Sequence, residues 1–251
     1  MGWLWRAAAV TLVMGLALEA RAAEIKVLCI PAMRASFEAL LPQFERDSGD
    51  KVTIHYQIFP GQKQRIESGD FDVAIFATPQ IEDLNKQGRT AAATTADIAR
   101  TSIGVAVKSG AAKPDISSEE AFKRTLLAAK SITYTKESQT GVYLTRQLER
   151  LGIAATIKDK LQLQPGGAMT TPAVARGEAE LGIVLVSDIL GTPGVDLVGP
   201  LPATLQHYVM QTAAVGATSK QPASGAALIK YLTSPAAGAV FKAKGFEPPP
   251  R

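Results

Sequence analysis

The chain has 251 residues, of which 46% are apolar and 20% are charged. This balance excludes an intrinsically disordered chain and provides enough apolar material for one large domain or two smaller ones. The single cysteine, Cys29, excludes an internal disulfide framework and a multi-cysteine metal centre. The net charge of +4 is spread along the chain and does not indicate nucleic-acid binding. We therefore expect neither a metal nor a cofactor.

The N-terminal residues 1–22 are typical of an export signal. Arg6 supplies a positive charge, Ala7–Leu18 is an apolar run, and Ala20–Ala22 has the A-x-A pattern of a cleavage site. The apolar run is too short to cross a membrane as a helix. We expect cleavage before Ala23 and a periplasmic product.

After this leader, short apolar runs alternate with segments of helical periodicity. For example, Phe37, Leu40 and Phe44 recur at helical spacing, and Gly49 ends that helix. In chain order, the predicted strands are Ile25–Ile30, Lys51–Gln57, Asp72–Phe76, Ser102–Lys108, Ser131–Thr135, Leu181–Val186 and Tyr208–Val215. The predicted helices are Ser36–Gly49, Gln62–Ser68, Ile81–Gln87, Glu119–Ala129, Gly141–Leu151, Thr171–Gly177, Gly225–Leu232 and Pro235–Lys244. This alternation predicts an α/β fold with parallel-rich sheets flanked by helices.

Four passages of the chain carry a resemblance to a known family. They are Ile25–Phe44, Gln64–Ala77, Gly177–Asp188 and Tyr231–Phe246. In this order and spacing they resemble the periplasmic molybdate-binding proteins of ABC importers. The resemblance implies a two-lobe periplasmic binding protein fold of type 2, in which two crossing strands join the lobes and the ligand lies in the cleft between them. It also implies that residues 24–102 plus 208–251 form the first lobe and residues 103–207 the second.

Several loops of this fold could provide an anion site. In open parallel sheets, ligands bind beyond the carboxyl ends of the strands, where the following helices present free N–H groups. Paired glycines also let the backbone approach a ligand closely. The candidate loops are Pro31–Ala35, Phe59–Gln62, Ala77–Gln80, Ser138–Val142 and the glycine-containing Pro165–Thr170.

The chain departs from the family pattern at the positions that would bind a tetrahedral oxyanion. Ala32 stands where the family has a serine, Leu185 stands where it has a tyrosine, and the serine-rich second loop reads Ile58–Gln62. Thr140 replaces an alanine. A hydrogen bond to a charged group contributes about 1.5–3 kcal/mol, so the loss of several hydroxyl donors disfavours molybdate.

The residues that replace these donors favour a larger, organic anion. Arg34 could hold a carboxylate through two parallel hydrogen bonds, and Lys63 could add a polar contact. Phe59 would contribute to an apolar wall. The predicted ligand-binding residues are Ala32, Met33, Arg34, Gly61, Gln62, Thr78, Thr140, Gly141, Val142, Gly167, Met169 and Leu185. We predict no metal ligand and no catalytic residue.

Three functions remain open. The first is a monomeric solute-binding protein that delivers a di- or tricarboxylate to the permease of an ABC importer. The second is an enzyme similar to aconitate isomerase, a relative of the molybdate-binding proteins, which moves a proton between two carbons of a tricarboxylate. No base stands out for that reaction, so Glu137 or Lys63 would have to serve. Asp188 follows a predicted strand and fits a helix cap better than a metal ligand. The third is molybdate or tungstate binding through backbone amides alone.

Overall fold

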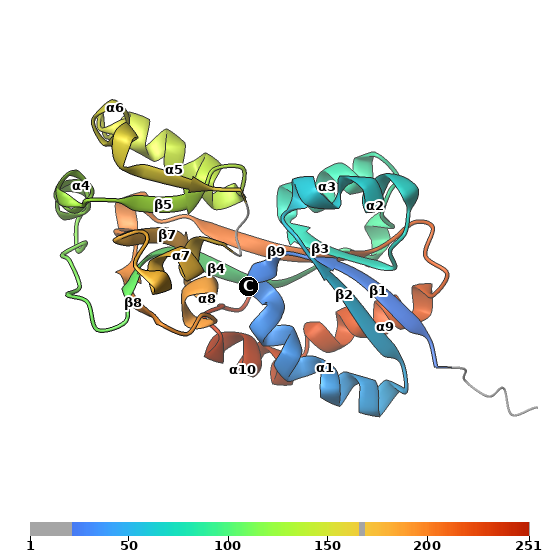
Figure 1. The fold of residues 1–251 in the computed structure, drawn as a ribbon. Helices are drawn as coiled ribbons and strands as arrows, with labels where there is room; N and C mark the ends of the chain where they lie inside the picture. Colours follow the sequence, from blue (N-terminus) through green and yellow to red (C-terminus); the bar gives the residue numbers. More distant parts are fainter. Residues whose placement is uncertain (1–21, 166–168, 251) are drawn as a thin grey trace, which may run out of the picture.

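The computed structural model describes residues 22–165 and 169–250 (Figure 1). The strands of this part form a curled sheet in the order β2-β1-β3-β9-β4-β7-β5-β6, and β8 pairs with β4 beside this path. The strands are β1 (Glu24–Cys29), β2 (Lys51–Tyr56), β3 (Val73–Ala77), β4 (Ala96–Lys108), β5 (Ile132–Thr135), β6 (Leu161–Gln164), β7 (Leu181–Leu185), β8 (Val195–Pro200) and β9 (Tyr208–Val215).

Helices cover both ends of this sheet. The α-helices are α1 (Arg34–Ser48), α2 (Lys63–Ser68), α3 (Thr78–Lys86), α4 (Glu119–Ala128), α5 (Gln139–Arg150), α6 (Ala154–Ile157), α7 (Thr170–Arg176), α8 (Val186–Leu190), α9 (Pro222–Leu232) and α10 (Pro235–Ala243). Two short 3-10 helices, η1 (Pro31–Met33) and η2 (Phe59–Gln62), lead directly into α1 and α2. No helix among the described residues is long and apolar enough to cross a membrane.

Parallel pairing at the two ends of the sheet and antiparallel pairing in its middle confirm the expected α/β periplasmic binding protein architecture. β1 is parallel to both β2 and β3, and β5 is parallel to both β6 and β7. β9 and β4 run antiparallel to each other and to their outer neighbours. In Figure 1 these two long strands pass between the two groups of helices.

Strand β4 changes its pairing partner halfway along its length. Residues 96–102 pair with β9, whereas residues 103–108 pair with β7 and β8. The division into a first lobe of residues 24–102 plus 208–251 and a second lobe of residues 103–207 stays our proposal, and this change of partner supports it.

Alternation along β1 shows how the first group of strands builds two core layers. Ile25, Val27 and Cys29 point to one face, where they pack with residues of α1, α9 and α10. Leu28 points to the opposite face, where Ile81 of α3 belongs to the same cluster. Cys29 is a free cysteine that is fully buried in this layer.

The sequence-based prediction missed several elements in the second half of the sheet. β4 begins at Ala96, so the expected start at Ser102 is wrong, and α6, β6, α8 and β8 were not expected. β6 alternates leucine with glutamine at the sheet edge, and β8 contains glycine and proline. These compositions carry little strand signal, because pairing with neighbours rather than local propensity determines such strands.

Candidate functional site

A cavity of about 70 Å³ lies where strands of both groups end and helices begin. Backbone and side chains of the junctions β1–η1, β3–α3, β5–α5 and β7–α8 line it, together with Ile58 before η2 and two residues of β9. The described lining residues are Ile30, Pro31, Ala32, Ile58, Ala77, Gln80, Thr135, Ser138, Gln139, Thr140, Ile183, Val184, Leu185, Asp188, Val209 and Gln211. The cavity thus lies at the strand ends where the sequence predicts a ligand.

At each junction the helix begins directly after an extended N-cap residue. Ile30, Ala77, Ser138 and Leu185 are the N-cap residues, and all four have extended backbone angles. A helix leaves its first N–H groups without intrahelical partners, so the first turns of α3 and α5 bring donors to the cavity wall. At α5 the Ser138 hydroxyl already accepts a hydrogen bond from the Gly141 N–H.

The structure brings three of the predicted ligand-binding residues to the cavity wall: Ala32, Thr140 and Leu185. The others lie outside the described lining. Met33 is fully buried in the core, and Val142 and Met169 are exposed by 46% and 47%. Gly61 and Gly141 lie close to other protein atoms. A Cβ added at Gly61 would collide with the Gln57 side chain, and a Cβ added at Gly141 would collide with the Thr135 carbonyl oxygen. Gly167 lies outside the described residues.

The predicted polar residues Gln62 and Thr78 are committed to other hydrogen bonds. Gln62 is buried and donates through Nε2 to the His55 carbonyl oxygen at 2.7 Å. The Thr212 hydroxyl donates to the Asp97 carboxylate at 2.6 Å, and Thr78 Oγ1 lies 2.7 Å from Thr212 Oγ1. A hydroxyl has a single proton, so Thr78 must be the donor to Thr212. The Thr78 proton is therefore not available to an anion.

The predicted cation Arg34 is turned away from the cavity. Its guanidinium lies over the Tyr56 ring, 4.1 Å from the ring centroid, and its side chain is exposed. Arg34 begins α1 only two residues after the lining residue Ala32, so the direction of its side chain, and not its place in the chain, keeps it out of the cavity lining. Lys63 is also exposed, and its Nζ lies 3.7 Å from Glu67 Oε1.

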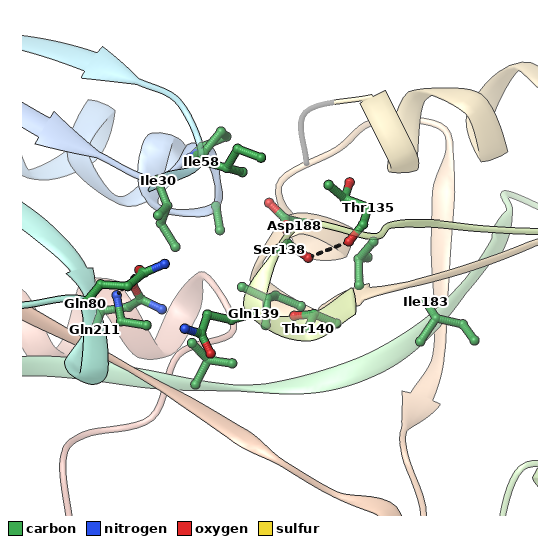
Figure 2. A pocket seen from close by; sticks show the side chains of 16 residues that line it. Ile30, Ile58, Gln80, Thr135, Ser138, Gln139, Thr140, Ile183, Asp188 and Gln211 are labelled. Atoms are coloured by element: carbon green, nitrogen blue, oxygen red, sulfur yellow. Dashed lines mark hydrogen bonds between the residues drawn. The ribbon is translucent and has the colours of Figure 1, made fainter. Parts of the chain in front are cut away.

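Three glutamines supply polar groups to the cavity in place of the expected Thr78 hydroxyl and Arg34 cation. Gln211 of β9 is fully buried, and neither its Nε2 nor its Oε1 has a hydrogen-bond partner. Gln80 Oε1 accepts a hydrogen bond from the Ala77 N–H at 3.2 Å, which leaves its Nε2 group for a ligand. In Figure 2, Gln80 and Gln211 extend from one side towards Gln139 of α5.

Asp188 is the one charged side chain among the described lining residues. It is the third residue of α8, whose N-cap is Leu185, so the prediction that Asp188 caps a helix is wrong. Asp188 is half-buried, and the loss of solvation around its carboxyl raises its pKa to about 7, with no other cause of the shift. No hydrogen-bond donor or cation of the described chain therefore holds the carboxylate in its charged form. Figure 2 shows Asp188 among the side chains of the cavity wall.

The sequence-based prediction did not include Gln80, Gln139, Gln211 or Asp188 among the ligand-binding residues. Gln80 and Gln139 lie in strand-to-helix loops that were singled out, and a polar residue in such a loop is a usable signal. Gln211 lies in the middle of a strand, where a polar residue in a mainly apolar segment was the only sign. Among the described residues, no group of three or more metal-ligating side chains could hold a metal ion.

Comparisons with known proteins agree on the family. The family model described as "Bacterial extracellular solute-binding protein" matches residues 25–247. An aconitate isomerase from Pseudomonas sp. is 32% identical over 90% of this chain and 88% of its own. The molybdate-binding protein ModA from Azotobacter vinelandii is 30% identical over 92% of both chains.

A solved structure shows the same fold. A periplasmic molybdate-binding protein from Azotobacter vinelandii superposes with a TM-score of 0.76 at 20% sequence identity, covering 90% of this chain and 100% of that one. Together with the match of the family model over nearly all described residues, these findings show that the chain belongs to the bacterial extracellular solute-binding protein family, in the branch similar to the molybdate-binding proteins.

Proposed function

We propose that this protein captures a small organic anion of the di- or tricarboxylate type in the cavity between its lobes and delivers it to an ABC importer. The observation that carries the proposal is the Gln211 amide, which is fully buried at the cavity wall without a protein partner. An unsatisfied buried amide is costly, so its retention in a cavity favours a ligand as the missing partner.

The other polar groups of the cavity suit a carboxylate. Gln80 and Gln139 offer amide N–H groups, and Thr140 offers a hydroxyl. The helix N-termini of α3 and α5 add a positive potential without a charged side chain. A carboxylate can therefore be held by neutral donors that lose little solvation energy on binding.

The walls of the cavity favour a ligand with a carbon skeleton. Ala32 and Leu185 line the cavity at the positions where the family resemblance places hydroxyl donors to an oxyanion. Ile30, Ile58 and Val209 extend this apolar surface. The Ser138 hydroxyl also donates its only proton to the Thr135 carbonyl oxygen at 2.8 Å, so it cannot donate to an oxyanion.

A ligand panel on the protein tests this proposal. Unfolding should be followed with molybdate, tungstate, sulfate, succinate, citrate, cis-aconitate and trans-aconitate in parallel. A ligand present at 100 times its Kd adds about 2.7 kcal/mol to the free energy of unfolding. We expect stabilisation by at least one of the carboxylates. Stabilisation by molybdate or tungstate alone would refute the proposal and favour oxyanion transport.

A second candidate function is isomerisation of a bound tricarboxylate, and Asp188 favours it. A carboxyl group with a pKa of about 7 exchanges protons readily near neutral pH, and this one borders the cavity. Its carboxylate would take a proton from a CH₂ carbon, the double bond would shift by one position, and a proton would be returned to the former alkene carbon. The base candidates Glu137 and Lys63 are exposed and do not line the cavity.

Proton NMR distinguishes binding from catalysis. The protein is incubated with trans-aconitate, and the signals of the cis isomer are followed over time, with Asp188→Asn as the control variant. Conversion by the parent and none by the variant would establish the isomerase. Binding of trans-aconitate without conversion would restrict the function to capture.

The cellular setting completes the proposal. The described relatives include periplasmic proteins, and residues 1–22 have the pattern of an export signal. We propose cleavage before Ala23, a monomeric periplasmic product and contact with ABC permease subunits. Mass analysis of the exported protein should give a chain that starts at or near Ala23, and a full-length chain in the cytoplasm would contradict it.

A further inference from the structure

We propose that Asp188 determines specificity in the cavity by binding one carboxylate of the ligand through a shared proton, so that capture of each anion is accompanied by uptake of a proton. This inference rests on the proposed function, because it needs a carboxylate in the cavity. It assigns to Asp188 a direct contact with the ligand rather than a structural role.

The geometry leaves a bound anion no cation to compensate the charge of Asp188. The cavity is small, about 70 Å³, and Asp188 is the one charged residue among its described lining. A ligand carboxylate that fills this space lies near the Asp188 carboxyl. Two carboxylates that share a desolvated site cannot both stay ionised, so one of them takes up a proton.

The other titratable groups around Asp188 are bonded to other residues, buried in the core, or at least partly exposed to solvent. α8 packs against β4, β7, β8 and η1, and the segment around Gly245 contacts it as well. Several titratable residues on or beside these elements and the cavity loops have partners of their own: Arg34 stacks on Tyr56, Asp97 accepts a hydrogen bond from Thr212, Arg100 pairs with Glu247, and Asp196 accepts hydrogen bonds from Ser109 and Gly110. Cys29 is buried in the core. The remaining ones are the exposed Lys108, Lys136 and Glu137 and the half-buried Lys244. None of them contributes to the pKa of Asp188.

A protonated Asp188 would act as a donor rather than a repulsive charge. Its O–H would donate to the ligand carboxylate, and hydrogen bonds of this charge-assisted type are short and strong. The proton comes from solvent and lies between one Asp188 oxygen and one oxygen of the ligand carboxylate. No other covalent bond forms or breaks. The ionised form of Asp188 repels the anion, and binding therefore weakens as pH rises through the pKa of the free protein.

Calorimetry with trans-aconitate tests the inference. Ordinary carboxyl groups ionise near pH 4, so a change of affinity between pH 6 and 8.5 reports on the protein. With a pKa of about 7 for Asp188, the affinity at pH 8.5 should be about 30-fold lower than at pH 6. Titrations at pH 8 in two buffers of different ionisation enthalpy should show uptake of about 0.9 proton per ligand, because about nine-tenths of the free Asp188 is ionised at that pH.

Two variants provide the matched comparison. Asp188→Asn keeps a neutral donor, so it should bind trans-aconitate with no pH dependence and more tightly than the parent at pH 8.5. Asp196→Asn is the control, because the Gly110 N–H and the Ser109 hydroxyl lower the pKa of Asp196 and that residue lies outside the cavity lining. It should keep the pH profile of the parent.

The outcomes separate this inference from the proposed function. Parent affinity that is equal at pH 6 and 8.5, or that rises with pH, overturns the role of Asp188 and leaves carboxylate capture intact. A pH dependence that persists in Asp188→Asn also overturns it. If neither the parent nor Asp188→Asn binds any carboxylate of the panel at either pH, the proposed function itself fails and the inference fails with it.

Discussion

Replacement of Gln211 by leucine tests whether this buried amide is kept for a ligand. The backbone of Gln211 is held on both sides, because it lies in register with Ala77 of β3 and Ala99 of β4. Its side chain is fully buried, and neither amide atom has a partner. Leucine has a similar volume and no polar atoms. The substitution therefore removes an unsatisfied amide without opening a large hole.

Stability and binding should change in opposite directions. An unsatisfied buried polar group costs about 1–3 kcal/mol. Neither amide atom of Gln211 is accessible to water, so Gln211→Leu should raise the free energy of unfolding of the ligand-free protein by about 1–3 kcal/mol. A lost hydrogen bond to a charged ligand costs about 1.5–3 kcal/mol, which weakens binding about 10- to 150-fold.

Urea unfolding and calorimetry with trans-aconitate measure the two effects on the same preparations. Gln62→Leu is the matched control, because Gln62 is equally buried but donates to the His55 carbonyl oxygen. Loss of this satisfied hydrogen bond should lower the free energy of unfolding by about 1 kcal/mol. A Gln211→Leu protein that is less stable than the parent and binds trans-aconitate equally well would refute the assignment of Gln211 to the ligand.

Three further predictions follow from the site. Gly141→Ala should lower the free energy of unfolding by about 2–3 kcal/mol, because the new Cβ would collide with the Thr135 carbonyl oxygen; an unchanged urea midpoint would contradict this close approach. The folded-state pKa of Asp188 is raised to about 7, whereas an unfolded chain has an aspartate pKa near 4. As pH rises from about 4 to 7, the free energy of unfolding of the parent should therefore fall by up to about 1.4 kcal/mol per pH unit. In Asp188→Asn this loss should disappear, and parallel pH titrations of the unfolding midpoint of both proteins check it. Arg34→Ala should weaken trans-aconitate binding less than about threefold, as expected for an exposed residue stacked on Tyr56, whereas a loss of about 2–5 kcal/mol would show that Arg34 reaches the ligand when the cleft closes.

The sequence by itself determined the fold class and the location of the site. Buried apolar runs such as Val73–Ala77 and Leu181–Leu185 are strands in the structure, as expected. Gly49, which ends a predicted helix, has the left-handed backbone angles that favour glycine. These features depend on short-range periodicity and backbone sterics, which the local sequence contains. The same periodicity places strand ends together, and the cavity lies there.

Only the tertiary structure decided which side chains form the cavity. Arg34 and Gln80 both lie in the first turn of a helix that follows a parallel strand. Arg34 nevertheless lies on Tyr56, whereas Gln80 accepts a hydrogen bond from the Ala77 N–H and lines the cavity. Gln211 and Asp188 are brought to the cavity by strand pairing and helix packing across the chain. The direction of a side chain depends on neighbours that are distant in the sequence, and the pKa of Asp188 depends on the burial that they produce. A local sequence pattern encodes neither the direction of a side chain nor its burial. The three glutamines and Asp188 therefore come together in one cavity only through the packing of distant parts of the chain.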